Sequence, residues 1–513
     1  MYSIFKNHKR KTLGLTLVMT AFLGSCQLSE GSFQLPDNPF RNPFLADPGL
    51  GVSVTEPVEH DFDEIKKRGT LRMITRYSSN TYFLHQGLEW GFEYELISHF
   101  AREHDLALEV IIVGADESPY DLLNSGRGDV IAASYTITPE RKEYVKFTRP
   151  YNLVDQVVVL SSDLEGSFQS LEDLVENDIT ISIGRNSSYY QRLKEFQQEG
   201  FEIDIQIVSN NNDTESLLFD VSSGAYMATV ADDNIFQASN KYMAGLMKGP
   251  VISRKDTIAW AIRKNAPNLE TEMNRFLYKH FRFSSNGQPP KRSTLLNVLR
   301  ERYFEGGKQI ADYYNPELSF PVSGVISPYD ELIKSVADSA GLDWLMISSM
   351  VAQETKFNPQ SESWAGAVGL MQILPRFSEV EDPQLLYDEG VNVREGVRII
   401  SEHLNHYSYM DSTNQWAFAL AAYNAGPGHI ADARRLAIDA NKNPNEWENV
   451  AEALLKLMQR RYYKDARYGF CRGIETVRYV EEITSRYDTY QSVWALAMQR
   501  QDRVMPGVVG LVD

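Results

Sequence analysis

The chain has 513 residues, of which 43% are hydrophobic and 23% are charged, and its formal net charge is −18 at pH 7. This length exceeds what one hydrophobic core supports and predicts at least two domains. Acidic residues outnumber basic ones, and the sequence contains no basic stripe and no cluster of zinc ligands. Nucleic acid is therefore not expected as a partner, because affinity for phosphate depends on Lys and Arg.

The first 25 residues have the pattern of a secretory signal peptide. Basic residues at positions 6–11 precede an apolar run at 13–23, which would span only about 16 Å as a helix and is too short for a bilayer core of about 30 Å. The run ends in Leu23-Gly24-Ser25-Cys26, which resembles the lipobox of bacterial lipoproteins. The resemblance implies cleavage before Cys26, attachment of a lipid anchor to its sulfur and, with Gln27 following, sorting to the outer membrane. The alternative is a plain signal peptide with an incidental cysteine.

Residues 26–59 are expected to form a flexible linker that begins with the lipidated Cys26. Prolines interrupt this segment, and no hydrophobic period runs through it. The prolines are Pro36, Pro39, Pro43, Pro48 and Pro57. The other cysteine, Cys471, then has no disulfide partner and is expected to be buried.

Residues 60–309 alternate between strand and helix patterns. Apolar or β-branched runs predict strands, and a one-sided apolar period predicts helices. The strands are expected at 71–75, 108–113, 157–160 and 180–183, and the helices at 93–104 and 269–281. This alternation predicts an α/β domain with largely parallel sheets.

Four stretches of this domain resemble the family 3 periplasmic solute-binding proteins. They are Gly91-Phe92-Glu93-Tyr94-Glu95-Leu96, Ser125-Gly126-Arg127-Gly128-Asp129-Val130, Thr136-Ile137-Thr138-Pro139-Glu140-Arg141 and Phe147-Thr148-Arg149-Pro150-Tyr151. The resemblance implies a non-catalytic, bilobed domain with a ligand cleft, whose lobes are joined by crossover strands near residues 148–152 and 244–251.

The same resemblance implies residues for an amino acid or a wall-derived peptide. Thr138 and Arg141 would hold its carboxylate, since a guanidinium offers a donor fork that matches two carboxylate oxygens. Ser187 and Ser188 resemble the carboxylate loop of the second lobe, and Asp232 lies near the usual amine-binding acid. Arg141 has the alternative of a surface salt bridge, and the residues flanking Asp232 depart from the family pattern.

Residues 310–513 have helical patterns throughout. One helix is expected after Pro328 and ends at Gly341, and the next covers about 342–355 with Trp344, Ile347 and Val351 facing inward. Glu354 continues that apolar face. Burial would raise the pKa of its carboxyl toward neutral pH, as a glycosidic general acid requires. The alternative is a helix-terminal Glu354 that turns outward to solvent.

Four ordered blocks in this region resemble the soluble-type lytic transglycosylases. They are Gln353-Glu354-Thr355, Ser363-Trp364-Ala365-Gly366-Ala367-Val368-Gly369-Leu370-Met371-Gln372, Ala421-Ala422-Tyr423-Asn424-Ala425-Gly426 and Glu475-Thr476-Val477-Arg478-Tyr479-Val480. The family usually has Ser after the catalytic Glu, and Thr355 keeps the hydroxyl. The resemblance implies an all-α, goose-lysozyme-like domain that cleaves peptidoglycan glycan strands. The two-domain combination resembles the membrane-bound lytic murein transglycosylases.

The resemblance implies that Glu354 acts first as acid and then as base, so that the muramic C6 hydroxyl closes a 1,6-anhydro ring. This is a lyase reaction without a metal or cofactor. It needs one carboxylate, whereas most glycosidases use two, and no second acid has a matching context. The expected substrate-binding residues are Ser363, Gly366, Met371, Gln372, Tyr423 and Asn424. Trp364 and Phe377 have two alternatives, stacking on sugar faces or packing in the core.

The sequence is also compatible with two other functions. One is a ligand-binding receptor or wall-docking protein whose lysozyme-like domain is inactive, and the other is a true hydrolase. We further expect the first domain to regulate the second, through a ligand-driven closure of the lobes that moves the segment around residues 300–325.

Overall fold

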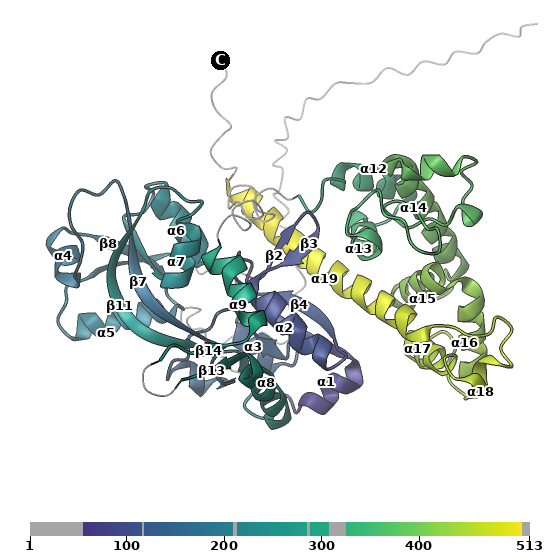
Figure 1. Cartoon of the computed structure of the whole chain (residues 1–513), viewed down its shortest axis with the longest axis horizontal. Coiled ribbons are helices and arrows are strands. Elements are labelled where there is room, and N and C mark those ends of the chain that lie inside the picture. Colours follow the sequence, from purple (N-terminus) through teal and green to yellow (C-terminus); the bar gives the residue numbers. More distant parts are fainter. Residues whose placement is uncertain (1–54, 115–116, 209–212, 285–287, 307–324, 505–513) are drawn as a thin grey trace, which may run out of the picture. The chain divides into compact units, whose positions relative to one another are not determined.

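The computed structural model describes residues 55–114, 117–208, 213–284, 288–306 and 325–504 (Figure 1). Cys26, the linker through residue 54 and most of the segment that joins the two predicted domains, residues 307–324, lie outside the described residues.

The first lobe is built on a five-stranded sheet with the order β4-β1-β5-β12-β6. β1 pairs in parallel with β4 and β5, whereas β12 runs antiparallel to β5 and β6. The strands are β1 (Thr70–Thr75), β4 (Ala107–Ile112), β5 (Val130–Ile131), β6 (Lys146–Phe147) and β12 (Ala261–Ile262). The strands expected at 71–75 and 108–113 are therefore confirmed.

Five helices belong to this lobe, and their apolar faces supply its core. Phe62, Leu96, Phe100 and Phe276 from these helices are buried together with Trp260. The helices are α1 (Phe62–Arg68), α2 (Phe92–Glu103), α3 (Pro119–Asn124), α8 (Pro267–His280) and α9 (Thr294–Arg300), followed by a π-helical turn (Glu301–Glu305). Two small hairpins complete the lobe: β2 (Phe83–His85) with β3 (Leu88–Trp90), and β13 (Phe281–Arg282) with β14 (Lys291–Arg292).

The second lobe has its own five-stranded sheet, with the order β11-β7-β10-β8-β9. β8 pairs in parallel with β9 and β10, and β7 runs antiparallel to β10 and β11. The strands are β7 (Asn152–Ser161), β8 (Thr180–Gly184), β9 (Asp204–Val208), β10 (Ala228–Asp232) and β11 (Leu246–Ile258). The helices are α4 (Leu171–Glu176), α5 (Ser188–Gln198), α6 (Thr214–Ser222) and α7 (Asp233–Ser239).

The chain passes between the lobes twice. The first passage lies at residues 148–151, between β6 and β7, as expected. The second was expected near 244–251, but β11 stays paired with β7 as far as Ile258, so the chain returns at residues 259–260. Register shifts between Lys248 and Val251 absorb Gly249 and Pro250, which lets the strand continue through residues that usually end one.

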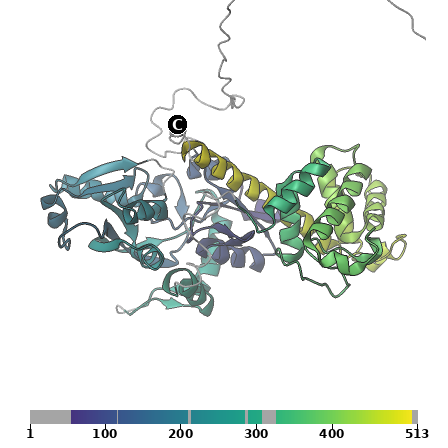
Figure 2. The same cartoon turned by 90° about the horizontal axis from the view of Figure 1, so that it is seen from above.

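The C-terminal region is a cluster of helices, coloured green to yellow in Figures 1 and 2. Its core surrounds α13 and α15, whose central residues are almost all buried. The helices are α12 (Asp330–Ala340), α13 (Trp344–Thr355), α14 (Glu389–His406), α15 (Ser412–Ala425), α16 (Pro427–Asp439), α17 (Trp447–Lys456), α18 (Arg460–Tyr463) and α19 (Gly473–Val504), with 3-10 turns at Pro375–Phe377 and Pro383–Tyr387. Cys471 is buried, as expected, and burial raises the pKa of its thiol to about 11.

These two architectures confirm the predicted fold class, an α/β bilobed domain followed by an all-α domain. Within the described ranges, no helix is both long and apolar enough to cross a bilayer.

Candidate functional site

Glu354 lies in the last turn of α13, the helix that the sequence predicts. Gly341 ends α12 in a left-handed conformation, and the side chain of Asp343 caps α13 by accepting from Leu345 N. Lys356 and Phe357 then both have positive φ, 53° and 60°, which side chains with a Cβ rarely adopt. Backbone strain therefore follows the candidate acid directly, as it often does at functional sites.

The carboxyl of Glu354 keeps some solvent access but is closely surrounded by protein. Burial raises its pKa to about 7, and a hydrogen bond from Tyr479 partly opposes that rise. The Tyr479 hydroxyl donates to Oε1 of Glu354 over 2.5 Å. The outward-turned alternative for Glu354 is therefore wrong. A carboxyl with a pKa near 7 can both give and take a proton at neutral pH.

The loop of residues 361–373 is fastened beside this carboxyl. The Thr355 hydroxyl donates to Leu370 O over 2.9 Å, and the Tyr423 hydroxyl donates to Met371 O over 2.8 Å. On the other side, Asn392 of α14 accepts from Met371 N and donates to Val368 O. Thr355 has a hydroxyl, like the Ser that the resembled family usually carries at this position. This hydroxyl connects α13 to the loop.

The two glycines of this loop differ in the space that surrounds them. Both have positive φ, 78° at Gly366 and 75° at Gly369. A Cβ on Gly369 would lie 2.1 Å from Nδ2 of Asn392, whereas a Cβ on Gly366 would meet nothing within 4 Å. Close packing against Asn392 therefore requires a glycine at position 369. At position 366 the space beside the backbone is open, and only the positive φ favours glycine.

Three other predicted residues of the loop hold its shape. Ser363 Oγ accepts from Ala367 N, and the Gln372 amide nitrogen donates to Ser361 O and Gly369 O. The oxygen of Gln372 is thus the part of its amide left for a substrate. The side chain of Met371 is fully buried against Gly396. Met371 therefore contributes to the site through its backbone carbonyl, which accepts a hydrogen bond from Tyr423.

Tyr423 and Asn424 stand at the end of α15, as the sequence indicates. Burial and the nearby charge of Glu354 hold the pKa of Tyr423 well above its usual value, so it is a neutral hydroxyl at physiological pH. Asn424 Oδ1 accepts from Thr476 Oγ1 of α19 over 2.9 Å. This bond joins the third and fourth sequence blocks.

In the first domain, Arg141 lies where the two lobes meet. Its guanidinium donates to Thr136 O and to Asn186 O, and it stacks on the ring of Tyr135. No salt bridge involving Arg141 is found among the described residues. The Thr138 hydroxyl accepts from the backbone N–H of Arg141, so it caps the turn that carries the guanidinium.

The predicted residues of the second lobe divide into two groups. Ser187 caps α5 and donates to Gly184 O, while Ser188 donates toward Thr136 of the first lobe over 3.3 Å. Asp232 is buried at the end of β10, and burial raises its pKa to about 7 against a hydrogen bond from Tyr189. Its Oδ1 has no partner among the described residues, and neither has the buried Oε1 of Gln156, its neighbour on β7.

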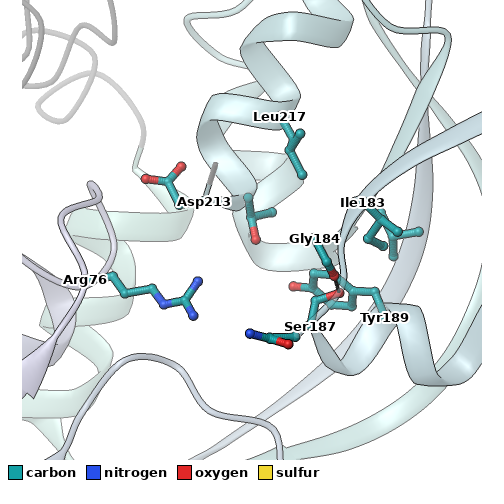
Figure 3. Close-up of a pocket in the computed structure, with 10 residues that line it drawn as sticks. Arg76, Ile183, Gly184, Ser187, Tyr189, Asp213 and Leu217 are labelled. Atoms are coloured by element: carbon teal, nitrogen blue, oxygen red, sulfur yellow. Dashed lines mark hydrogen bonds between the residues drawn. The ribbon is translucent and has the colours of Figure 1, made fainter. Parts of the chain in front are cut away.

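An open cavity of about 400 Å³, including solvent at its mouth, lies next to these residues (Figure 3). Figure 3 shows Arg76 reaching from the first lobe toward Ser187 and Tyr189 of the second. Asp213 and Thr214, at the start of α6, also line the cavity. Of the five predicted residues of this domain, Ser187 alone is among those that line it.

Sequence reasoning missed three of these residues, Tyr479, Arg76 and Gln156. Tyr479 stands in the fourth block, so its place in an ordered family pattern was the signal that could have found it. The contacts of Arg76 and Gln156 join distant parts of the chain, and local spacing carries no trace of them. Among the described residues, no group of three or more potential ligands could hold a metal ion.

Two family models match the chain in its two domains. Residues 62–282 match the family 3 bacterial extracellular solute-binding proteins, and residues 331–446 match the transglycosylase SLT domain. A crystal structure of an ancestral amino acid-binding protein, a precursor of cyclohexadienyl dehydratase, is 27% identical; it covers 47% of this chain and 98% of its own, with a TM-score of 0.39.

Curated relatives match both domains together. Membrane-bound lytic murein transglycosylase F of Desulfosudis oleivorans is 32% identical over 83% of this chain and 90% of its own length. The protein of the same name from Shewanella sediminis is 31% identical over 83% of this chain and 86% of its own. With both domains matched in order and over this length, the chain belongs to the membrane-bound lytic murein transglycosylase F family, whose substrate is peptidoglycan.

Proposed function

We propose that Glu354 cleaves the MurNAc–GlcNAc β-1,4 bond without water, as a carbon–oxygen lyase. The observation that carries this proposal is a single carboxyl, raised to a pKa of about 7, that accepts a hydrogen bond from Tyr479. Protonated Glu354 donates to the glycosidic oxygen as the bond to C1 breaks. The resulting carboxylate then takes the proton of the muramic C6 hydroxyl, whose oxygen bonds to C1. The proton returns to Glu354, and the atoms balance without water.

Neighbouring residues have supporting roles in this proposal. Tyr479 orients the carboxyl and stabilises its charged form, which lets the base step follow the acid step. Tyr423 and Thr355 fix the loop of residues 361–373. Ser363, Gly366, Gln372 and Asn424 would shape the glycan groove, and the free amide oxygen of Gln372 is positioned to accept from an acetamido N–H.

Digestion of purified sacculi by the wild type and by Glu354→Gln tests this proposal. The amide keeps the shape of the side chain but cannot cycle a proton, so the variant should fold and lose cleavage. A variant that keeps more than about a tenth of the wild-type rate would remove Glu354 from the acid/base role. Mass spectrometry of the wild-type products should show anhydro ends; reducing ends would indicate a hydrolase.

We also propose that the first domain binds an amino acid or a peptide with free charged ends, such as a wall-derived stem peptide. Arg141 can hold a carboxylate at the lobe junction. Oδ1 of Asp232 and Oε1 of Gln156, which have no partner in the described part of the chain, are two buried acceptors that an ammonium group would satisfy. Calorimetry with stem peptides should show binding that Arg141→Ala and Asp232→Asn each weaken. Equal affinity in all three proteins would exclude this site.

Ligand binding would regulate cleavage through α19. The Gln353 amide, next to Glu354, donates to Glu482 and accepts from Arg486, and Arg486 forms an ion pair with Glu89 of β3 at 3.7 Å. A ligand that favours one arrangement of the lobes can act on Gln353 through this pair. Residues 307–324, part of the segment expected to move, lie outside the described residues.

The assay for regulation compares cleavage rates with and without stem peptide in the wild type and in Arg486→Met. The peptide should change the rate of the wild type, and Arg486→Met should bind the peptide but lose that response. Peptide binding that leaves the wild-type rate unchanged would rule out regulation and favour a wall-docking role.

The membrane attachment is proposed to be a lipid on Cys26 at the periplasmic face of the outer membrane. The lipobox-like sequence supports it, and so do the names of the relatives, which call them membrane-bound. Fractionation of cells that express the wild type should find the protein with the outer membrane, and its recovery with the inner membrane would exclude this location.

A further inference from the structure

The tip of the loop beside Glu354 carries a tryptophan with almost no cover. Trp364 is 92% exposed, whereas every other large hydrophobic residue in the described part of the chain is 64% exposed or less. An indole can bury on the order of 200 Å² of surface, so this exposure leaves a large apolar face in water. The core-packing alternative for Trp364 is therefore wrong.

The backbone holds this tryptophan on a tight turn. Ser363 N donates to Ala367 O, Gly366 N donates to Ser363 O, and Ala367 N donates to Ser363 Oγ. Glu362 and Val368 form a β-bridge below the turn. The indole is thus displayed by a hydrogen-bonded turn and not by a loose segment.

The indole ring of Trp364 is left almost entirely to solvent. Among the described residues, Trp364 has no hydrogen bond, ring contact or cation–π contact. Phe377, an exposed aromatic residue in the 3-10 turn that follows the loop, differs in this respect, because the guanidinium of Arg376 lies 4.9 Å from its ring centroid. Both faces of the indole are available to a ligand.

The turn is continuous with the candidate active site. Leu370, in the same loop, accepts the hydrogen bond from Thr355, the residue after Glu354. At most about 20 Å of extended chain separates Trp364 from Leu370. A polymer that lies across Glu354 can therefore reach the indole without leaving the surface of this domain.

We propose that Trp364 is a specificity-determining residue that stacks on a sugar ring of the glycan strand, outside the pair of sugars whose bond is cleaved. A pyranose ring presents a flat face of C–H groups that fits the negative face of an indole. The stacking would favour long strands over short fragments, because a short fragment fills the site at Glu354 and does not extend to the turn. This inference rests on the proposed function.

The test measures the binding of glycan strands, with and without their stem peptides, to the full chain carrying Glu354→Gln, which prevents turnover. Added Trp364→Ala should weaken binding about five- to tenfold, the range expected for the loss of one stacked ring. Trp364→Phe should lose less. Tyr409→Ala is the matched control, because Tyr409 is 59% exposed on another turn of the same domain and should leave affinity unchanged. Since Trp364 has no side-chain contact among the described residues, both Trp364 variants should melt at the parent's temperature.

Each outcome decides between the proposals. Equal affinity with and without the indole overturns the role of Trp364 and leaves the function of Glu354 intact. A loss seen only with peptide-bearing strands would identify the stem peptide as the occupant and overturn the sugar assignment. If the Glu354→Gln parent binds no glycan at all, the proposed function fails and this inference fails with it. In the active chain, Trp364→Ala should raise KM for long strands and leave kcat on short fragments unchanged.

Discussion

Replacing Glu354 by Gln should stabilise the protein at high pH while it abolishes activity. The pKa of Glu354 is raised from 4.5 to about 7, mainly by burial. At about 1.4 kcal/mol per pKa unit, this rise corresponds to about 3 kcal/mol. The folded protein binds the proton more tightly than the unfolded chain, so wild-type stability falls as pH rises from 4.5 to about 7. The amide introduced by Glu354→Gln would not titrate, and its oxygen can still accept from Tyr479.

Thermal unfolding from pH 4 to pH 8 measures this difference in the transition of the C-terminal domain. The two proteins should melt together near pH 4, and by pH 8 the variant should melt up to about 10 °C higher. Glu331→Gln is the matched control, because Glu331 of α12 has 95% of its side chain exposed and should show no such divergence. A stability difference between wild type and Glu354→Gln that is the same at both pH values would refute the buried-acid interpretation.

Three further predictions concern the neighbouring loop, the tyrosine and the anchor. Tyr479→Phe removes the hydrogen bond that lowers the pKa of the Glu354 carboxyl, so the alkaline limb of the pH–rate profile should move upward and the rate should fall at least about tenfold. Gly366→Ala should lower the free energy of unfolding by about 1–2 kcal/mol, because its positive φ is unfavourable for alanine. Gly369→Ala should lower it clearly more, because its Cβ would also clash with Asn392 and with the backbone of Leu386. Equal losses in denaturant titrations would contradict the packing described. Cys26→Ser should abolish labelling by radioactive fatty acid and release the protein to the soluble periplasmic fraction, and a wild type that never labels would show that the lipobox is incidental.

The sequence predicts α13 and the candidate acid Glu354 because the signals are local. Gly341 ends the preceding helix, and the apolar spacing of Trp344, Ile347 and Val351 predicts a helix whose inner face continues to Glu354. Strands β1 and β4 and helix α2 are predictable for the same reason, since each has its own period within a short segment.

Contacts between distant residues could not be predicted in this way. The bond from Tyr479 to Glu354 joins residues 125 positions apart, and only the folded chain brings them together. Met371 stands in a motif that suggests substrate contact, yet packing against α14 buries its side chain. The return between the lobes was predicted too early because register shifts let β11 continue past Gly249 and Pro250.

Digestion of peptidoglycan in water enriched with ¹⁸O tests the central claim most directly. If the C6 hydroxyl of the muramic residue is the nucleophile, the new glycan ends are 1,6-anhydro and carry no ¹⁸O, since no water enters the reaction. Mass spectrometry of the released fragments should therefore show ends that are lighter than reducing ends by one water and unlabelled. One ¹⁸O per cleaved bond, at a reducing C1, would show that water is the nucleophile and would contradict the role proposed for Glu354 as a base toward the substrate.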